Sequence, residues 1–141
     1  MNLDASRSEY ERRCERMASR CLRQAPWLAS PVAVALFLGS FRFESFLLTP
    51  LVFIAGYAVL ALSALLVFDA WLFRLMASYP DGATGGAAVD DVLARMRLKP
   101  LAAVTRPLDD RIRGTNRILM LQFVAFLVFA PAWLAAAARM G

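Results

Sequence analysis

The stretch Ser45–Phe68 reads SFLLTPLVFIAGYAVLALSALLVF and carries no charged side chain over its whole length. Two further charge-free runs, Gln24–Phe41 and Ile118–Ala138, precede and follow it along the chain. At about 1.5 Å of rise per residue, these runs predict helices of roughly 36, 27 and 32 Å, close to the roughly 30 Å hydrocarbon core of a bilayer. We therefore predict an all-α membrane protein with three transmembrane helices.

The composition favours the same fold class. Apolar residues make up 60% of the 141-residue chain, against roughly 45–50% in soluble domains. Because a long charged arm follows Met1 and precedes the first apolar run, a removable signal peptide is not expected. The predicted organisation is an amphipathic basic arm at 1–24, a transmembrane hairpin at 25–79 with spans at about 25–41 and 46–69, a loop at 80–116, and a third span with a short tail at 117–141.

Basic residues fall unevenly on the two sides of the predicted spans. Fourteen of the sixteen lie before the first span or between the second and third, whereas only Arg42 and Arg139 lie on the other side. Because basic residues beside transmembrane helices favour the cytoplasmic side, we predict a cytoplasmic N-terminus, a cytoplasmic loop at 80–116 and an external C-terminus. The net charge of +5 then needs no nucleic-acid partner. The preference for arginine over lysine and the many alanines favour a multi-pass protein of a bacterial inner (cytoplasmic) membrane.

The N-terminal arm has the pattern of an amphipathic helix. Its apolar residues recur at the helical period, whereas its arginines fall elsewhere; the apolar set is Tyr10, Cys14, Met17, Cys21 and Leu22. Such a helix can lie along the inner leaflet, which we favour, or dock on a cytoplasmic partner. Cys14 and Cys21 are about 10 Å apart on one helix face, too far for a disulfide, and are expected to be small buried residues. Pro26 predicts a helix break before the first span.

The loop at 80–116 is predicted to contain a short amphipathic helix from about Ala87 to Lys99, after a flexible turn through Gly85 and Gly86. Thr105 is the expected N-cap of the next helix. That helix is predicted to continue into the third span, with a possible bend at Gly114.

Paired aspartates are the strongest candidates for chemistry in the chain. Asp90 with Asp91, and Asp109 with Asp110, can hold Mg²⁺ against a lipid diphosphate while arginines bind its oxygens. Each pair also suits the first turn of a predicted helix for structural reasons, and further acidic residues at helical spacing are missing. With no histidine in the chain, we expect no catalytic residue, no cofactor and no metal site.

Polar residues within the spans are few. Ser63 and Gln122 are expected to form interhelical hydrogen bonds rather than a transport site. Asp69, at the inner end of the second span, is expected to pair with Arg74 near the headgroups, and a bond to a partner subunit is the alternative.

Small residues on the first two spans predict close helix packing. The predicted packing residues are Ala55, Ala58, Ala61 and Ala64 on the second span, and Ala29, Ala33 and Gly39 on the first. The third span carries an aromatic series instead, namely Phe123, Phe126, Phe129 and Trp133. Three helices cannot cover all of these faces, which favours packing against copies of the chain or against other membrane subunits.

These features predict a non-enzymatic accessory or assembly subunit of a bacterial inner-membrane complex, with membrane lipids and other membrane subunits as partners. The residues predicted to contact headgroups or a partner are Arg12, Arg13, Arg16, Arg20, Arg23, Arg111 and Arg113. One alternative is a homo-oligomeric pore or holin-like permeabilising protein. A second, less favoured, is an enzyme that modifies lipid diphosphates through the paired aspartates.

Overall fold

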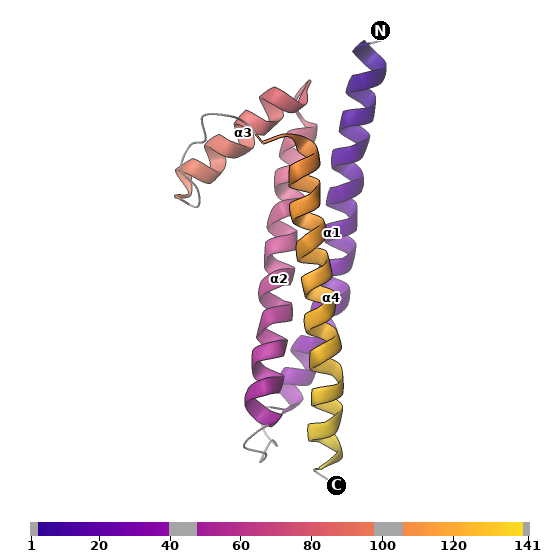
Figure 1. The fold of residues 1–141 in the computed structure, drawn as a ribbon, viewed down its shortest axis with the longest axis vertical. Helices are drawn as coiled ribbons and strands as arrows, with labels where there is room; N and C mark the ends of the chain where they lie inside the picture. Colours follow the sequence, from indigo (N-terminus) through magenta and orange to yellow (C-terminus); the bar gives the residue numbers. More distant parts are fainter. Residues whose placement is uncertain (1–2, 40–47, 98–105, 140–141) are drawn as a thin grey trace. The chain divides into compact units, whose positions relative to one another are not determined.

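The computed structural model describes residues 3–39, 48–97 and 106–139, and within them the chain is helical (Figure 1). The helices are α1 (Leu3–Gly39), α2 (Leu48–Ala77), α3 (Gly82–Arg95) and α4 (Leu108–Ala138). By length and composition α1, α2 and α4 are each able to cross a membrane. The predicted all-helical fold with three candidate spans is confirmed, and it indicates a multi-pass membrane protein.

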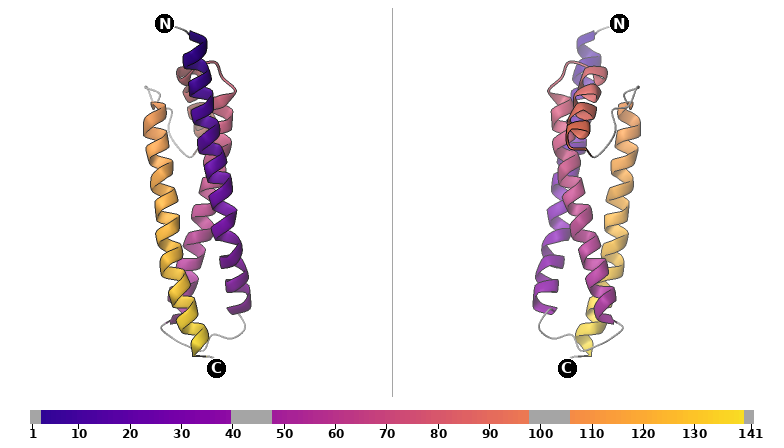
Figure 2. Two further views of the ribbon diagram at one scale, coloured as in Figure 1. Left: turned by 90° about the vertical axis from the view of Figure 1, so that its right-hand side faces the viewer. Right: turned by 90° about the vertical axis from the view of Figure 1, so that its left-hand side faces the viewer.

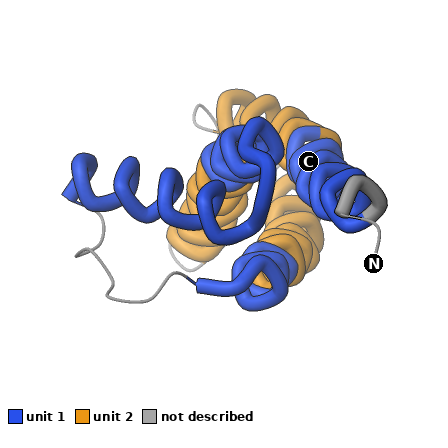
Figure 3. The backbone as a smooth tube through the Cα atoms, turned by 90° about the horizontal axis from the view of Figure 1, so that it is seen from above, with its two compact units in different colours: residues 1–22, 68–116 blue, residues 23–67, 117–141 orange. Residues whose placement is uncertain are grey.

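The chain divides into two compact units, coloured separately in Figure 3. Unit 1 consists of residues 1–22 and 68–116, and unit 2 of residues 23–67 and 117–141. Helices α1, α2 and α4 each contribute one segment to each unit, whereas α3 belongs to unit 1 alone.

Unit 2 contains the apolar core that the three long runs predict. Its segments of α1, α2 and α4 lie side by side in both views of Figure 2. Each helix contributes residues at helical spacing to the core: Leu28, Val32 and Leu36 from α1, Val52, Ala55 and Val59 from α2, and Phe129, Ala132 and Ala136 from α4. At Gly56 the helices approach so closely that an added Cβ would lie 2.8 Å from Cδ1 of Leu36. The small-residue character of α2 therefore serves packing within the chain over this stretch.

The predicted helix break at Pro26 is wrong, because α1 continues through both Pro26 and Pro31. Both proline rings are exposed, whereas Leu28 and Val32 are buried. A proline removes one backbone hydrogen bond, and transmembrane helices tolerate this loss where packing and local side-chain bonds compensate. Ser30 Oγ also donates to the Pro26 carbonyl oxygen at 2.7 Å, which adds a side-chain hydrogen bond to this stretch of α1.

The apolar face of the N-terminal arm is covered within unit 1. Cys14, Met17 and Cys21 are buried, as are Phe73 and Met76 of α2. Both cysteines are free thiols, as expected. This apolar face is therefore buried within the chain, and the placement of the arm along the inner leaflet stays a prediction.

Helix α3 begins five residues before its predicted start near Ala87, so the expected flexible turn through Gly85 and Gly86 is wrong. Asp81 caps the helix, as its Oδ1 accepts a hydrogen bond from the Thr84 backbone N–H at 2.8 Å. Both glycines are buried inside the first half of the helix. Helix α4 runs through Gly114, and the predicted features at Lys99 and Thr105 lie outside the described residues.

Candidate functional site

The first polar feature of unit 1 is the N-terminus of α3. Thr84 donates to Asp81 Oδ1 twice, from its backbone N–H at 2.8 Å and from its Oγ1 at 2.9 Å. These bonds stabilise the ionised carboxylate and hold the pKa of Asp81 below its ordinary value. Because Asp81 is an N-cap rather than part of a flexible turn, the start of α3 is fixed by its own sequence.

Tyr10 contacts the first turns of α3. Its ring would lie 3.3 Å from a Cβ added at Gly82, and its hydroxyl 2.7 Å from one added at Gly85. The same hydroxyl donates to the Met76 carbonyl oxygen at 3.4 Å. At Gly85 the obstacle is also backbone, since the Met76 carbonyl oxygen would lie 3.0 Å from the added Cβ. The two glycines therefore allow α3 to pack closely against α1 and α2.

Each of the four paired aspartates is bound by an arginine of the same chain. Arg111 Nη2 lies 2.8 Å from Asp90 Oδ1, and this pair is largely buried, with 12% and 7% of the two side chains exposed. Arg13 of α1 pairs with Asp109 of α4. The remaining pairs are local and exposed: Arg95 with Asp91 at 2.9 Å, and Arg113 with Asp110 at 3.6 Å.

The structure changes the interpretation of one aspartate pair. Asp109 and Asp110 lie in the first turn of α4, as predicted. Asp90 and Asp91 instead lie in the second half of α3, so the macrodipole does not explain them. The Asp90 carboxylate accepts a hydrogen bond from Arg111 and so connects α3 to α4.

Asp69 has a different partner from the one predicted. Thr115 Oγ1 donates to Asp69 Oδ2 at 2.7 Å, which joins α2 to α4 within unit 1. Arg74 is five residues from Asp69, which places the two about 140° apart around the helix. The prediction of an Asp69–Arg74 pair is therefore wrong, and Arg74 faces a separate hollow.

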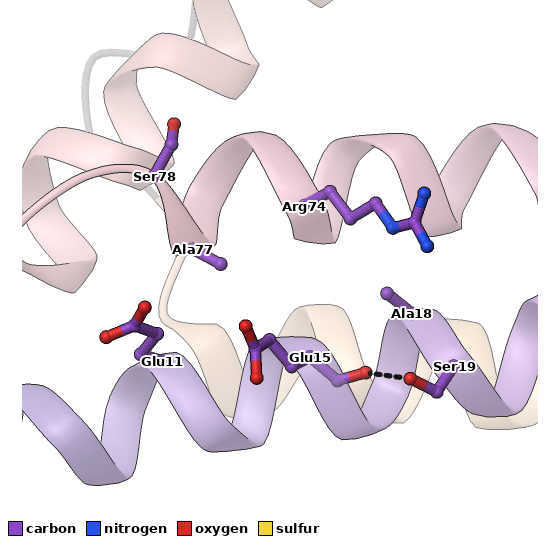
Figure 4. Close-up of a pocket in the computed structure, with 7 residues that line it drawn as sticks. All are labelled: Glu11, Glu15, Ala18, Ser19, Arg74, Ala77 and Ser78. Carbon is purple, nitrogen blue, oxygen red and sulfur yellow. Dashed lines mark hydrogen bonds between the residues drawn. The ribbon is translucent and has the colours of Figure 1, made fainter.

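A hollow of 480 Å³ lies between α1 and α2 in unit 1 (Figure 4). It is lined by Glu11, Glu15, Ala18 and Ser19 of α1 and by Arg74, Ala77 and Ser78 at the end of α2. Among the residues drawn in Figure 4, the only hydrogen bond is that from Ser19 Oγ to the Glu15 carbonyl oxygen at 2.8 Å. The two carboxylates and the guanidinium therefore face the hollow without neutralising one another.

Polar side chains in unit 2 join the three helices. Gln122 Nε2 donates to Ser63 Oγ at 2.7 Å, and Gln24 Nε2 donates to the Leu119 carbonyl oxygen at 3.2 Å. Trp133 Nε1 donates to the Ala35 carbonyl oxygen at 3.1 Å. Ser63 and Gln122 thus form the interhelical hydrogen bond that was predicted for them.

The predicted packing residues do not share one environment. Ala55 and Gly39 are buried, and Ala29 and Ala58 are half-buried. Ala33, Ala61 and Ala64 are exposed. A three-residue repeat drifts around a helix with 3.6 residues per turn, so the alanine series of α2 starts in the core and ends on the outer surface. The aromatic series of α4 divides in the same way, with Phe129 buried and Phe123 exposed.

The predicted contact arginines also differ from one another. Arg13 and Arg111 are engaged by aspartates, and Arg20 Nη1 lies 3.5 Å from Asn116 Oδ1. Arg12 and Arg16 donate to carbonyl oxygens one turn earlier in α1. Arg23 is exposed, and Arg113 pairs locally with Asp110.

Sequence patterns did not identify the hollow or the Tyr10–glycine contact. The i, i+4 spacing of Glu11 and Glu15 places both on one face of α1, but it does not show which helix they face. Comparisons with protein-family models, with curated proteins and with solved structures found no match to the chain.

Proposed function

We propose that this chain is a non-enzymatic accessory or assembly subunit of a bacterial inner-membrane complex. In this proposal α1, α2 and α4 cross the membrane, and a partner helix docks on the outer face of α2. Residues 1–22 and 68–116, which contain twelve of the sixteen basic residues, lie on the cytoplasmic side.

One surface of α2 carries the proposal. Ile54, Tyr57, Ala61, Ala64 and Leu65 recur at helical spacing and are all exposed. Ile54 and Tyr57 are 69% and 62% exposed, and Leu65 is 49% exposed. The small side chains of Ala61 and Ala64 lie among these larger ones, and small residues allow another helix to approach closely in lipid. We call this set the α2 outer face.

The charge pattern of unit 1 supports a non-enzymatic role. A metal-dependent reaction on a diphosphate needs carboxylates that are free to bind the cation. The four aspartates that suggested this chemistry are each bound to an arginine of the chain.

The placement of polar groups in unit 2 disfavours the alternative of a water-filled pore. Ser63 and Gln122 are buried and bound to each other. A pore formed by several copies needs polar groups on the outer helix faces, whereas the α2 outer face consists of alanine, aliphatic residues and one tyrosine.

Site-specific photo-crosslinking in cells tests the proposal. A photoreactive residue at position 61 is expected to give an adduct with a different membrane protein, whereas one at the exposed Ala135 of α4 serves as the matched control. Ala61→Leu with Ala64→Leu should abolish co-purification of the captured protein, and Ala135→Leu should not. Adducts of twice the chain's mass would support self-association instead. Equal adducts at both positions, or none, would contradict docking on the α2 outer face.

A further inference from the structure

The hollow between α1 and α2 is lined by charged groups of both signs. Glu11 and Glu15 extend from α1, and Arg74 extends from α2 towards the end of the hollow formed by Ala18 (Figure 4). Its volume of 480 Å³ is large enough for a small polar group rather than a single water molecule.

The neighbouring arginines of α1 bond to groups that do not line the hollow. Arg12 Nε donates to the Ser8 carbonyl oxygen at 3.0 Å, and Arg16 Nε donates to the Arg12 carbonyl oxygen at 3.3 Å. Arg13 pairs with Asp109. Arg74 is therefore the guanidinium that lines this hollow, and its head group lies towards Ala18 rather than towards the two carboxylates (Figure 4).

The charges follow an order along the helices. On α1 the apolar run begins at Gln24, so Ser19 lies nearer to it than Glu15 and Glu11 do. On α2 the apolar run ends at Phe68, so Arg74 lies nearer to it than Ala77 and Ser78 do. Along each helix, the positive end of the hollow therefore lies closer to the charge-free run, and the negative end lies farther from it.

We propose that the hollow binds the headgroup of a phosphatidylethanolamine lipid. In such a lipid the phosphate is attached next to the acyl chains, and the primary ammonium extends beyond it. Arg74 binds the phosphate as a guanidinium–oxygen pair. Glu11 and Glu15 accept hydrogen bonds from the ammonium, and Ser19 and Ser78 border the two ends.

The same charges discriminate between lipid classes. A phosphatidylglycerol headgroup offers Arg74 a phosphate but presents no cation to the two carboxylates. The trimethylammonium of phosphatidylcholine has no N–H to donate to them. This proposal depends on membrane insertion of the chain but not on the partner proposed for the α2 outer face.

Native mass spectrometry of the full-length protein in detergent tests the site. The probes are phosphatidylethanolamine, phosphatidylcholine and phosphatidylglycerol with identical acyl chains, added in equal amounts. The wild-type chain should retain phosphatidylethanolamine about fivefold more than either competitor, the size expected for exposed charge pairs. Glu11→Gln with Glu15→Gln should remove this preference, and Arg74→Gln should reduce retention of all three lipids.

Matched control variants test whether the lipid preference depends on the charges that line the hollow. Glu9→Gln and Arg7→Gln remove the same charges from exposed positions of α1 outside the hollow, and both should retain the wild-type preference. Equal or greater retention of phosphatidylglycerol or phosphatidylcholine by the wild-type chain would overturn the proposal. So would an unchanged preference in the Glu11, Glu15 double variant.

A soluble competitor separates the lipid from a free metabolite. Free phosphoethanolamine carries the same two charged groups, but it lacks the acyl chains that hold a lipid at the membrane. It should not displace bound phosphatidylethanolamine at equal concentration. Displacement at equal concentration would assign the hollow to a soluble amine phosphate and overturn the lipid assignment.

Discussion

The two units of the chain differ in the interactions that join the helices inside each unit. In unit 1 the segments of α1, α3 and α4 are joined by arginine–aspartate pairs, with Arg111–Asp90 buried and Arg13–Asp109 exposed. In unit 2 nine apolar residues form the core, and amide, hydroxyl and indole groups supply its interhelical hydrogen bonds. Charge pairs thus add to close packing in unit 1, whereas packing and hydrogen bonds from uncharged side chains connect the described helix segments of unit 2.

This difference matches the surroundings that each unit is proposed to occupy. In lipid the hydrophobic effect does not drive helices together, so close packing and a few hydrogen bonds must do so. Unpaired charges are costly there, and the charge-free runs of unit 2 avoid that cost. In an aqueous or headgroup region charged side chains remain solvated and can select their partners.

The largest effect is expected at the buried ion pair of unit 1. Arg111→Leu leaves the Asp90 carboxylate buried without its guanidinium and should destabilise the protein by about 3 kcal/mol. Thermal unfolding in detergent measures the loss. The double variant Arg111→Leu with Asp90→Leu should recover most of it, because both charges of this pair are then removed. A loss below about 0.5 kcal/mol for the single variant, as for an exposed pair, would contradict the role of Arg111.

Glycine substitutions compare packing in the two units directly. Gly85→Ala should cost about 1–3 kcal/mol, because the added Cβ meets the Met76 backbone as well as the Tyr10 hydroxyl. Gly56→Ala should cost less, because Leu36 presents only the movable end of its side chain. Gly114→Ala is the control, with nothing within 4 Å of the added Cβ, and should stabilise α4 by up to about 1 kcal/mol.

Combining Gly85→Ala with Tyr10→Phe sharpens this test. Removal of the hydroxyl eliminates one of the two close contacts, so the double variant should recover part of the lost stability. Equal destabilisation by Gly85→Ala and Gly114→Ala would show that the close approach at Gly85 is absent.

A smaller effect is expected from the amide of unit 2. Gln122→Leu removes the hydrogen bond to Ser63 and should cost about 1 kcal/mol, as is usual for one interhelical bond in a membrane protein. Ser63→Ala should cost little more in that background, because the two residues share one interaction. The exposed neighbour Met120 provides a control, since Met120→Leu should leave the unfolding temperature unchanged.

The smallest effect concerns pH and the start of α3. Because the folded pKa of Asp81 is lowered, its stabilising effect is fully present above the ordinary aspartate pKa and is lost as pH falls through the folded pKa. Amide hydrogen exchange in the first turn of α3, corrected for intrinsic rates, should therefore accelerate only below about pH 4. Asp81→Asn keeps a capping side chain and should remove this dependence. The same acid response in Asp81→Asn would contradict the assignment.

The fold was predictable where one physical rule dominates. Charge-free runs of bilayer length identified α1, α2 and α4, and the rarity of polar groups in those runs predicted that Ser63 and Gln122 form interhelical hydrogen bonds. The prediction of a helix break at Pro26 was wrong because proline is less disruptive in a packed transmembrane helix than in water. The predicted start of α3 was wrong because Gly85 and Gly86 suggested a turn, whereas Asp81 caps the helix earlier and Gly85 packs against Tyr10 within it.

The candidate site was less predictable, because its residues come from separate helices. Nothing in the local sequence links Arg111 to Asp90 rather than to Asp109 or Asp110, or links Asp69 to Thr115. The hollow likewise depends on two helices, because Glu11 and Glu15 come from α1 and Arg74 comes from α2. Spacing within one helix predicts which residues share a face, but the partner of that face requires the tertiary structure.

Membrane topology is the most direct test of the central claim that three helices cross the bilayer with the charged segments of unit 1 on the cytoplasmic side. Single cysteines at positions 8, 106 and 139, in a variant lacking Cys14 and Cys21, can be labelled in intact spheroplasts with a membrane-impermeant maleimide. The account predicts labelling at position 139 alone before permeabilisation, and at all three positions afterwards. Labelling at position 106 in intact spheroplasts would contradict it.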